Sequence, residues 1–325
     1  MKVSVLMITY NHEQFITEAI ESALAQRTSF DYELVIGEDC STDNTGRIVD
    51  DYARRNPQRI RVIRSDCNIG IRRNFDRVLQ ACEGEYVAML EGDDRFICRD
   101  KLQIQAEFLD AHADHSMVFH RIRTFDELDK QRGWTGDDCT SMTENWIENL
   151  ILWNYISTVT VMFRRELTKG FNVDVWPEEL LYTDYGLWLW LALKGRFGFV
   201  PDIMAEYRLH AGGVCSSQTR EADERNWLSV YPHAEKLVGP QYRDLVRRQW
   251  YSRLYKFALD TCNQYGPEAA RPYARDVLFF RPLHRHPMQR LKMMFMSYAP
   301  GLFNAIAGRV GYPRIANYPA NQEKL

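Results

Sequence analysis

The chain has 325 residues, of which 45% are hydrophobic, and a formal net charge of -3 at pH 7. This length fits one large domain or one and a half domains of a soluble globular protein. The near-neutral charge argues against wholesale binding to nucleic acid, which normally requires a strongly basic domain. No stretch approaches the ~20 uninterrupted apolar residues of a membrane span.

Cysteine usage and the N-terminal residues indicate the compartment. Seven cysteines are scattered without a CxxC pair or a compact cluster with histidine, which favours neither zinc nor a disulfide framework. The apolar run at residues 3–8 is shorter than the apolar region of a secretion signal, and it lacks a small-residue cleavage site. We therefore expect a cytoplasmic protein in a reducing environment.

The first third of the chain alternates short apolar runs with amphipathic helical patterns. Strands are expected at residues 2–8, 32–37 and 61–64, and helices at about 13–26, 44–55 and 72–82. Asn56-Pro57 ends the second helix, because the residue before a proline is pushed out of the helical region. Such strand-helix repetition predicts an α/β fold with a parallel sheet covered on both faces.

A fourth apolar run, Tyr86 to Leu90, leads directly into Glu91-Gly92-Asp93-Asp94. The run has the composition of a buried strand, so the acids should lie at its carboxyl end, where open α/β sheets bind ligands. Hard oxygen ligands at such a place suit Mg²⁺ or Mn²⁺, and either ion would hold a diphosphate. Alternatively, the acids form a loop that begins the next helix, with Asp94 or Asp100 as its N-cap.

The middle of the chain is less regular. We expect a helix at about 101–111, a strand at 117–122, a helix at 144–152, a β-rich run at 157–163 and a helix at 185–193 that ends at Gly195. Between Thr124 and Thr143 no period of either kind is sustained, which favours a loop of the kind that can move over a site.

From about residue 221 the strand signal disappears and long amphipathic helices follow. We place a boundary there, between a domain at 1–220 and a helical C-terminal region at 221–325. Val277 to Gln322 contains no Asp or Glu, yet carries six Lys or Arg interleaved with Met, Phe and Leu. This pattern predicts peripheral membrane contact through residues 282–315. The same residues could instead pack on the domain, with the cations in water, or form a homodimer surface.

Polar side chains also follow the first two expected strands, as Thr9-Tyr10-Asn11 and as a run that begins with Asp39. The Tyr10 ring could stack on a nucleobase, and the Asp39 carboxylate could accept from the ring N–H of a uracil or guanine. In a simpler alternative, Tyr10 is a partly buried anchor and Ser41 or Asp43 caps the following helix.

Taken in order, these segments resemble glycosyltransferase family 2. The resemblance covers roughly residues 1–215 and implies a GT-A fold, a mostly parallel central sheet flanked by helices, here with a C-terminal helical appendage. It is carried by Thr9-Tyr10-Asn11 with Glu13, Asp39-Cys40-Ser41-Thr42-Asp43-Asn44-Thr45, Asn68-Ile69-Gly70-Ile71-Arg72-Arg73-Asn74, Glu91-Gly92-Asp93-Asp94, Thr183-Asp184 and Tyr207-Arg208-Leu209-His210.

The resemblance implies two groups of binding residues. The ion, Mn²⁺ or Mg²⁺, would be held by Asp93, Asp94 and His210, and either Asp could be the direct ligand; alone, His210 could equally be a satisfied surface histidine. Glu91 stands where the family often has Asp, which leaves its participation open. The implied nucleotide-binding residues are Thr9, Tyr10, Asn11, Glu13, Asp39, Asn68, Arg72 and Asp93.

Asp184 resembles the catalytic base of the family, although it follows Thr183 where another acid is usual. The implied reaction is an inverting displacement at the anomeric carbon. Asp184 would remove the proton of an acceptor hydroxyl while the cation and His210 stabilise the departing nucleoside diphosphate. Alternatively, Asp184 merely caps its helix.

The substrates are expected by family resemblance alone. The donor should be a UDP-linked sugar, and the acceptor a glycan or lipid-linked molecule of bacterial-type surface polysaccharide or glycolipid assembly, met at the inner face of the cell membrane. A soluble acceptor is the alternative, and a non-catalytic protein that binds nucleotide sugars is a third. No P-loop or dinucleotide-binding glycine motif occurs at a strand-helix junction.

Overall fold

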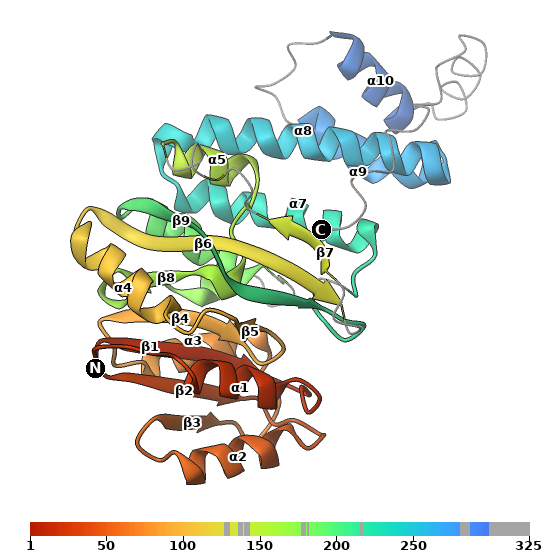
Figure 1. The fold of residues 1–325 in the computed structure, drawn as a ribbon. Coiled ribbons are helices and arrows are strands. Elements are labelled where there is room, and N and C mark those ends of the chain that lie inside the picture. Colours follow the sequence, from red (N-terminus) through yellow and green to blue (C-terminus); the bar gives the residue numbers. More distant parts are fainter. Residues whose placement is uncertain are drawn as a thin grey trace. The chain divides into compact units, whose positions relative to one another are not determined.

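A computed structural model of the chain describes residues 1–126, 131–135, 139, 144–176, 180, 182–214, 217–279 and 287–298, drawn as a ribbon in Figure 1. The chain divides into two compact units, Met1–Thr219 and Arg220–Leu325. The first is built around one sheet, and the described part of the second consists of helices.

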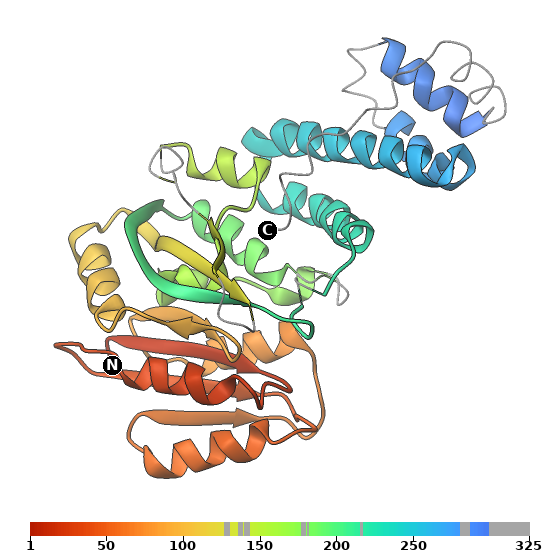
Figure 2. The ribbon, with the colours of Figure 1, turned by 45° about the vertical axis from the view of Figure 1, so that its right-hand side comes forward.

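Four parallel strands form the N-terminal part of the sheet, in the order β3-β2-β1-β4. They are β1 (Val3–Thr9), β2 (Tyr32–Glu38), β3 (Ile60–Arg64) and β4 (Tyr86–Glu91). Every residue of β1 and β2 is buried, because helices cover both faces of the sheet. As Figures 1 and 2 show, α1 (Ile16–Leu24) and α2 (Thr45–Arg55) lie over one face, and α3 (Ile71–Ala81) over the other.

The sheet continues with strands of mixed direction: β5 (Arg95–Phe96), β6 (His115–Asp126), β7 (Gln131–Thr135), β8 (Met162–Arg164) and β9 (Arg196–Leu209). The long strands β6 and β9 run parallel and side by side (Figure 1), whereas β8 is antiparallel to both β4 and β6, β5 to β9, and β7 to β6. Helices α4 (Lys101–Ala111), α5 (Trp146–Leu152) and α6 (Thr183–Ala192) complete the unit. The predicted α/β class with a mostly parallel, helix-flanked sheet is confirmed.

Two local predictions were wrong. The loop expected from Thr124 to Thr143 is partly strand, since β6 continues to Asp126 and residues 131–135 form β7; the rest lies largely outside the described residues. The β-rich run at 157–163 begins as a 3₁₀ turn at Thr158–Thr160, in which the Thr160 hydroxyl donates to the Ser157 carbonyl oxygen at 2.6 Å. Such local bonds from Thr compete with strand pairing.

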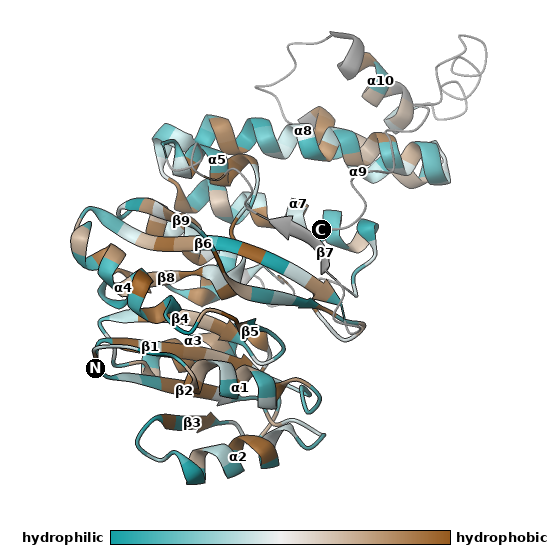
Figure 3. Cartoon of the chain, viewed as in Figure 1, coloured by the Kyte–Doolittle hydropathy of each residue, from teal (hydrophilic) through white to brown (hydrophobic). Residues whose placement is uncertain are grey.

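The second unit contains α7 (Arg220–Leu237), α8 (Pro240–Tyr265), α9 (Pro267–Phe279) and α10 (Pro287–Tyr298). Figure 3 shows hydrophobic and hydrophilic residues mixed along α8, as expected for a helix with one packed side. The shared core takes Tyr251, Leu254, Ala258 and Cys262 from α8, Ala270, Ala274 and Val277 from α9, and Met293 and Met296 from α10. No helix among the described residues is long and apolar enough to cross a membrane. Residues 282–286 and 299–315 of the predicted membrane-contact segment lie outside the described residues.

Candidate active site

The strand register brings the predicted polar segments to one edge of the sheet. Central strand β1 pairs with both β2 and β4, so that Thr9 lies opposite Glu38 and Ile8 lies opposite Glu91. The residues that follow each strand therefore meet at the carboxyl edge, as expected for a parallel sheet that binds a ligand there.

Asn11 and Glu13 join the segment after β1 to the loop after β2. The Asn11 side-chain oxygen accepts from the Thr42 amide at 2.8 Å, and Asn11 has a positive φ of 54°, which asparagine tolerates better than most residues. The Glu13 carboxylate accepts from the backbone and side-chain nitrogens of Asn44 at 2.9 and 2.8 Å. Both predicted nucleotide-binding side chains thus shape the rim of the site.

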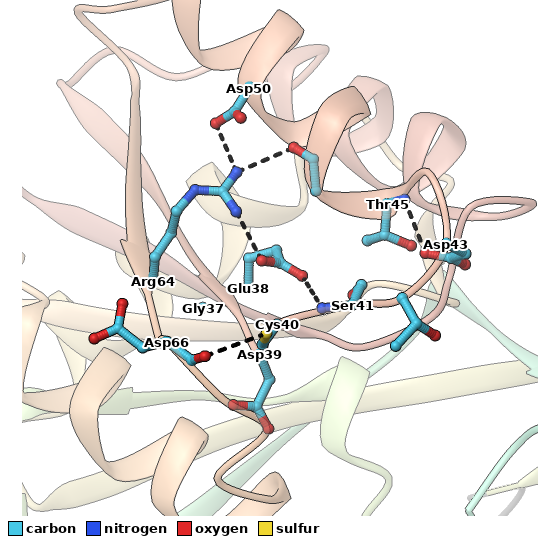
Figure 4. Close-up of polar contacts among 12 residues, drawn as sticks. Gly37, Glu38, Asp39, Cys40, Ser41, Asp43, Thr45, Asp50, Arg64 and Asp66 are labelled. Carbon is cyan, nitrogen blue, oxygen red and sulfur yellow. Dashed lines mark hydrogen bonds and ion pairs between the residues drawn. The ribbon is translucent and has the colours of Figure 1, made fainter.

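A buried carboxylate holds the base of the same loop, as Figure 4 shows. Glu38 pairs with Arg64 at 2.7 Å and accepts from the Ser41 amide, also at 2.7 Å, while Arg64 reaches Asp50 at 2.6 Å. Asp43 accepts from the Thr45 amide at 2.9 Å, although the N-cap of α2 is Asn44, whose side chain makes no capping bond. The base of the loop after β2 is therefore fixed, and Arg77 connects it to Asp39, since its guanidinium donates to the Glu38 carbonyl oxygen at 2.9 Å and lies 3.7 Å from the Asp39 carboxylate.

Asp39 is buried and turned toward the loop before α3. Its two carboxylate oxygens accept from the amides of Ile69 at 3.0 Å and Gly70 at 2.9 Å. Asn68 also accepts from the Gly70 amide, at 3.0 Å, and Gly70 has a φ of 84°, which favours glycine. The structure thus brings Asp39 and Asn68 together, and a ligand would use the remaining lone pairs of the Asp39 carboxylate.

Two other predicted nucleotide-binding residues lie in different settings. Tyr10 is 40% exposed at the tip of β1, so its ring is open to stacking. Arg72 is buried and donates to the Val173 carbonyl oxygen at 2.7 Å and the Asp174 carboxylate at 3.1 Å. Arg72 therefore connects α3 to the 3₁₀ turn at Val173–Val175.

Asp93 lies between two histidines. Its Oδ2 is 3.0 Å from His210 Nε2 and 3.7 Å from His12 Nε2, and His12 Nδ1 is 3.2 Å from the hydroxyl oxygen of the buried Thr9. Burial alone would raise the pKa of Asp93. The hydrogen bond with His210 and the charges of both histidines outweigh burial, so the Asp93 pKa lies below its usual range. Asp93 is therefore ionised at neutral pH.

Asp94, by contrast, points into the protein. One of its oxygens accepts from the Arg208 amide at 2.9 Å, and the Arg208 Nε donates to the Asp93 carbonyl oxygen at 2.8 Å. Burial, followed by the charges of Asp93 and Glu91, raises the pKa of Asp94 well above its usual value. Arg208 also pairs with Glu18 and so fixes both aspartates from β9.

Glu91 and Asp184 form the other end of the acid cluster. Burial, together with the charges of Asp93 and Asp184, raises the pKa of Glu91 to about 8. Asp184 lies in the first turn of α6, and the Thr158 hydroxyl donates to its carboxylate at 3.4 Å. Burial raises the pKa of Asp184 to about 6, although the Tyr185 amide and Thr158 favour the charged form.

The fit of the acid cluster to a divalent cation depends on which of its oxygen and nitrogen atoms are available. Among the described residues, no three His, Cys, Asp or Glu side chains are already arranged around a metal position. The chemistry nevertheless fits, because the Asp93 carboxylate and the His210 imidazole are ligand types that suit Mn²⁺. Beside them, Glu91 and Asp94 each have one buried oxygen without a hydrogen-bond partner.

Three residues at the site were missed from the sequence. His12 belongs to the segment after β1, Arg208 to the Tyr207–His210 segment, and Thr158 to the turn before β8. Arg208 stood inside a segment already singled out, so its position was a usable signal. His12 and Thr158 carry no spacing or periodicity that marks them, and only the fold brings them to the acids.

Comparison with known proteins shows the family to which the sequence is similar. A family model described as "Glycosyl transferase family 2" matches residues 4–171. An uncharacterized protein of Mycobacterium tuberculosis (strain ATCC 25618 / H37Rv) is 36% identical over 244 residues, which cover 75% of this chain and 68% of that protein. The putative teichuronic acid biosynthesis glycosyltransferase TuaG of Bacillus subtilis is 31% identical over 237 residues, which cover 72% of this chain and 89% of TuaG.

Solved structures resemble the chain along most of its length. Residues 1–349 of TarS from Staphylococcus aureus, in complex with UDP, match with a TM-score of 0.59 and 21% identity over 95% of this chain and 87% of that one. A mannosyltransferase from Pyrobaculum calidifontis, in complex with GDP-Man and Mn²⁺, matches with a TM-score of 0.56 and 17% identity over 96% and 81%. At these identities the likeness bears on the fold, and the predicted GT-A fold is confirmed.

Proposed function

The chain belongs to glycosyltransferase family 2, and from this premise we propose that it moves a sugar from a UDP-linked donor to an acceptor hydroxyl with inversion at the anomeric carbon. One observation carries the proposal. At the carboxyl edge of the sheet, an ionised Asp93 that faces His210 lies in the same acid cluster as Asp184, a carboxyl with a raised pKa. A carboxylate that can hold a cation on the leaving group's side and a base on the acceptor's side are the two groups that this displacement needs.

Asp184 is proposed as the general base. Its carboxylate would take the proton of the acceptor hydroxyl as the hydroxyl oxygen forms its bond to the anomeric carbon and the bond to the diphosphate breaks. A pKa of about 6 suits this role, because the group is mostly deprotonated at neutral pH yet basic enough to accept the proton. Inversion follows from the single displacement.

We assign the direct metal contact to Asp93 and His210, and an indirect role to Asp94. Asp93 is ionised and faces the imidazole, whereas Asp94 is buried and already bonded to the Arg208 amide. A bound Mn²⁺ or Mg²⁺ would stabilise the negative charge that develops on the departing diphosphate. Arg208 would keep Asp93 in place by holding its carbonyl oxygen.

The nucleotide is proposed to lie along the segments after β1 and β2 and before α3. The exposed Tyr10 ring would stack on the base, and Asp39, with Asn68 beside it, would accept from the base N–H. Asn11 and Glu13 would act by shaping the rim.

The acceptor is proposed to be a growing glycan or lipid-linked sugar of a cell-surface polysaccharide. Support comes from TuaG, whose name places it in teichuronic acid biosynthesis, and TarS, named a poly(ribitol-phosphate) beta-N-acetylglucosaminyltransferase. The same chemistry on a soluble acceptor is the second candidate. One feature of the C-terminal helices supports the first.

Helix α10 has apolar residues on two sides. Met293 and Met296 are buried in the core of the second unit, whereas Leu291, Met294 and Tyr298 are 43%, 44% and 62% exposed. The spacing of the exposed three, i, i+3 and i+7, places them along one face. Because the chain from residue 277 to 322 lacks acids, this face would suit an anionic lipid surface at the inner side of the cell membrane.

A panel of nucleotide sugars, tested for thermal stabilisation with and without Mn²⁺, would test the donor assignment, because a ligand that binds the folded state raises its stability. Stabilisation by a UDP-sugar that depends on Mn²⁺ is expected. Equal stabilisation with and without the metal would overturn the metal assignment. Binding without any transfer or donor hydrolysis would instead indicate the non-catalytic alternative.

A further inference from the structure

Thr158 lies where two carboxyl groups of the candidate site approach each other. It belongs to the 3₁₀ turn that precedes β8, and its hydroxyl donates to Asp184 at 3.4 Å. The same hydroxyl contacts the carboxyl of Glu91, at the end of β4. A hydroxyl has one donor and two acceptor positions, so it can donate to the Asp184 carboxylate while it accepts from the protonated carboxyl of Glu91.

The turn that carries Thr158 is held by a buried polar pair on α4, Gln105 and Lys101. The Gln105 amide donates to the Thr160 carbonyl oxygen at 2.8 Å, and Lys101 donates to the Gln105 side-chain oxygen at 2.7 Å. Both α4 side chains are fully buried. Buried polar groups are costly unless their partners are fixed, so this pair ties the turn to one position.

We propose that Thr158 is a positioning residue, whose hydroxyl holds the Asp184 carboxylate toward the acceptor, and that Gln105 and Lys101 hold the turn that presents it. The inference rests on the proposed role of Asp184 as the base. The sequence adds a reason for such a residue, because Asp184 follows Thr183 and not the acid that the family usually has there. Thr158 gives the base a contact from another element, in addition to the bond from the Tyr185 amide of α6 itself.

The test compares Thr158→Val, which keeps the shape and loses the hydroxyl, with Thr158→Ser, which keeps the hydroxyl. Thr168→Val is the matched control, because the Thr168 hydroxyl donates to the Arg165 carbonyl oxygen in a neighbouring turn, at 2.7 Å. For each variant, kcat is measured from pH 5 to pH 8, and UDP binding is measured by thermal stabilisation.

The hydroxyl favours the charged form of Asp184, so its loss should raise the pKa of the base. The acid limb of kcat for Thr158→Val should therefore move to higher pH by up to about one unit, with about tenfold more loss at pH 5 than at pH 8. UDP binding should stay within about twofold, and Thr158→Ser should restore the limb. An unchanged limb, with or without a lower plateau, would overturn the proposal.

A second variant tests the support for the turn. Gln105→Glu keeps an oxygen for Lys101 but removes the amide that donates to Thr160, so it should shift the same limb by a smaller amount. A Gln105→Glu limb at the wild-type position would remove the buried pair from the proposal. Asp184→Asn distinguishes a failure of the proposed base from a failure of the positioning role. If Asp184→Asn retains turnover, Asp184 is not the base. If Asp184→Asn loses turnover but the acid limb of Thr158→Val stays at the wild-type pH, only the positioning role of Thr158 is rejected.

Discussion

The proposed base, Asp184, predicts how turnover depends on pH, because burial raises the pKa of its carboxyl to about 6. A base has to be deprotonated to act, so kcat should follow the deprotonated fraction of this carboxyl. That fraction is about 90% at pH 7 and about 10% at pH 5, so kcat should fall about tenfold between these values. Asp184→Asn removes the base and should lower kcat by about 10² to 10⁴-fold at pH 7, while donor binding stays intact.

The assay is release of nucleoside diphosphate at saturating donor and acceptor, with UDP binding followed separately by thermal stabilisation. Asp202→Asn, at an exposed position of β9, is the matched control and should keep wild-type kcat at every pH. A wild-type kcat that stays level from pH 7 to pH 5 would refute the assignment of the limb to Asp184. Near-normal turnover of Asp184→Asn would refute its role as the base.

Three other outcomes are expected. Asp93→Ala should abolish transfer and the Mn²⁺-dependent part of the stabilisation by UDP. Asp94→Ala should abolish transfer and also lower the melting temperature, since it removes the partner of the buried Arg208 amide. Thermal shift measured with and without Mn²⁺ distinguishes the two variants. Burial lowers the Lys101 pKa to about 7, so between about pH 7 and 10.4 this lysine is neutral in the folded state and charged in the unfolded state. Over that range the free energy of unfolding, measured with urea, should rise with pH. Lys101→Met should lack this rise. Met294→Glu and truncation near Pro282 should each weaken co-sedimentation with anionic vesicles at low salt. Tyr265→Glu, at an exposed position at the end of α8, is the control and should not. A full-length protein that does not bind such vesicles would favour the soluble acceptor.

Much of the fold was predictable because the N-terminal strands are buried on both faces. Such strands read as continuous apolar runs between helical patterns, and β1, β2 and β4 all have this form. Strand β9 was missed because Gly198, Pro201 and several charged residues interrupt its pattern. Residues 196–209 form a strand because they pair with β6, and shifts in the register of this pairing accommodate the irregular residues.

The acidic part of the site was predictable for a related reason. An acid that directly follows a buried parallel strand has to emerge at the ligand-binding edge, so Asp93 and Asp39 could be placed from the sequence. The distinction between Asp93 and Asp94 could not, because it depends on which carboxyl meets His210 and which meets the Arg208 amide. Those contacts come from β9 and the residue after it, which were not predicted as part of the sheet.

The two departures from the family pattern meet at one place in the structure. Glu91 stands where the family often has Asp, and Thr183 stands where an acid usually precedes the base. The charge of Asp184 contributes to the raised pKa of Glu91, and Thr158 contacts both carboxyls, so Glu91 lies within electrostatic reach of the proposed base. A glutamate reaches one methylene further than an aspartate. The site therefore has a second carboxyl near Asp184, that of Glu91 at the end of β4, although the residue before Asp184 is not an acid.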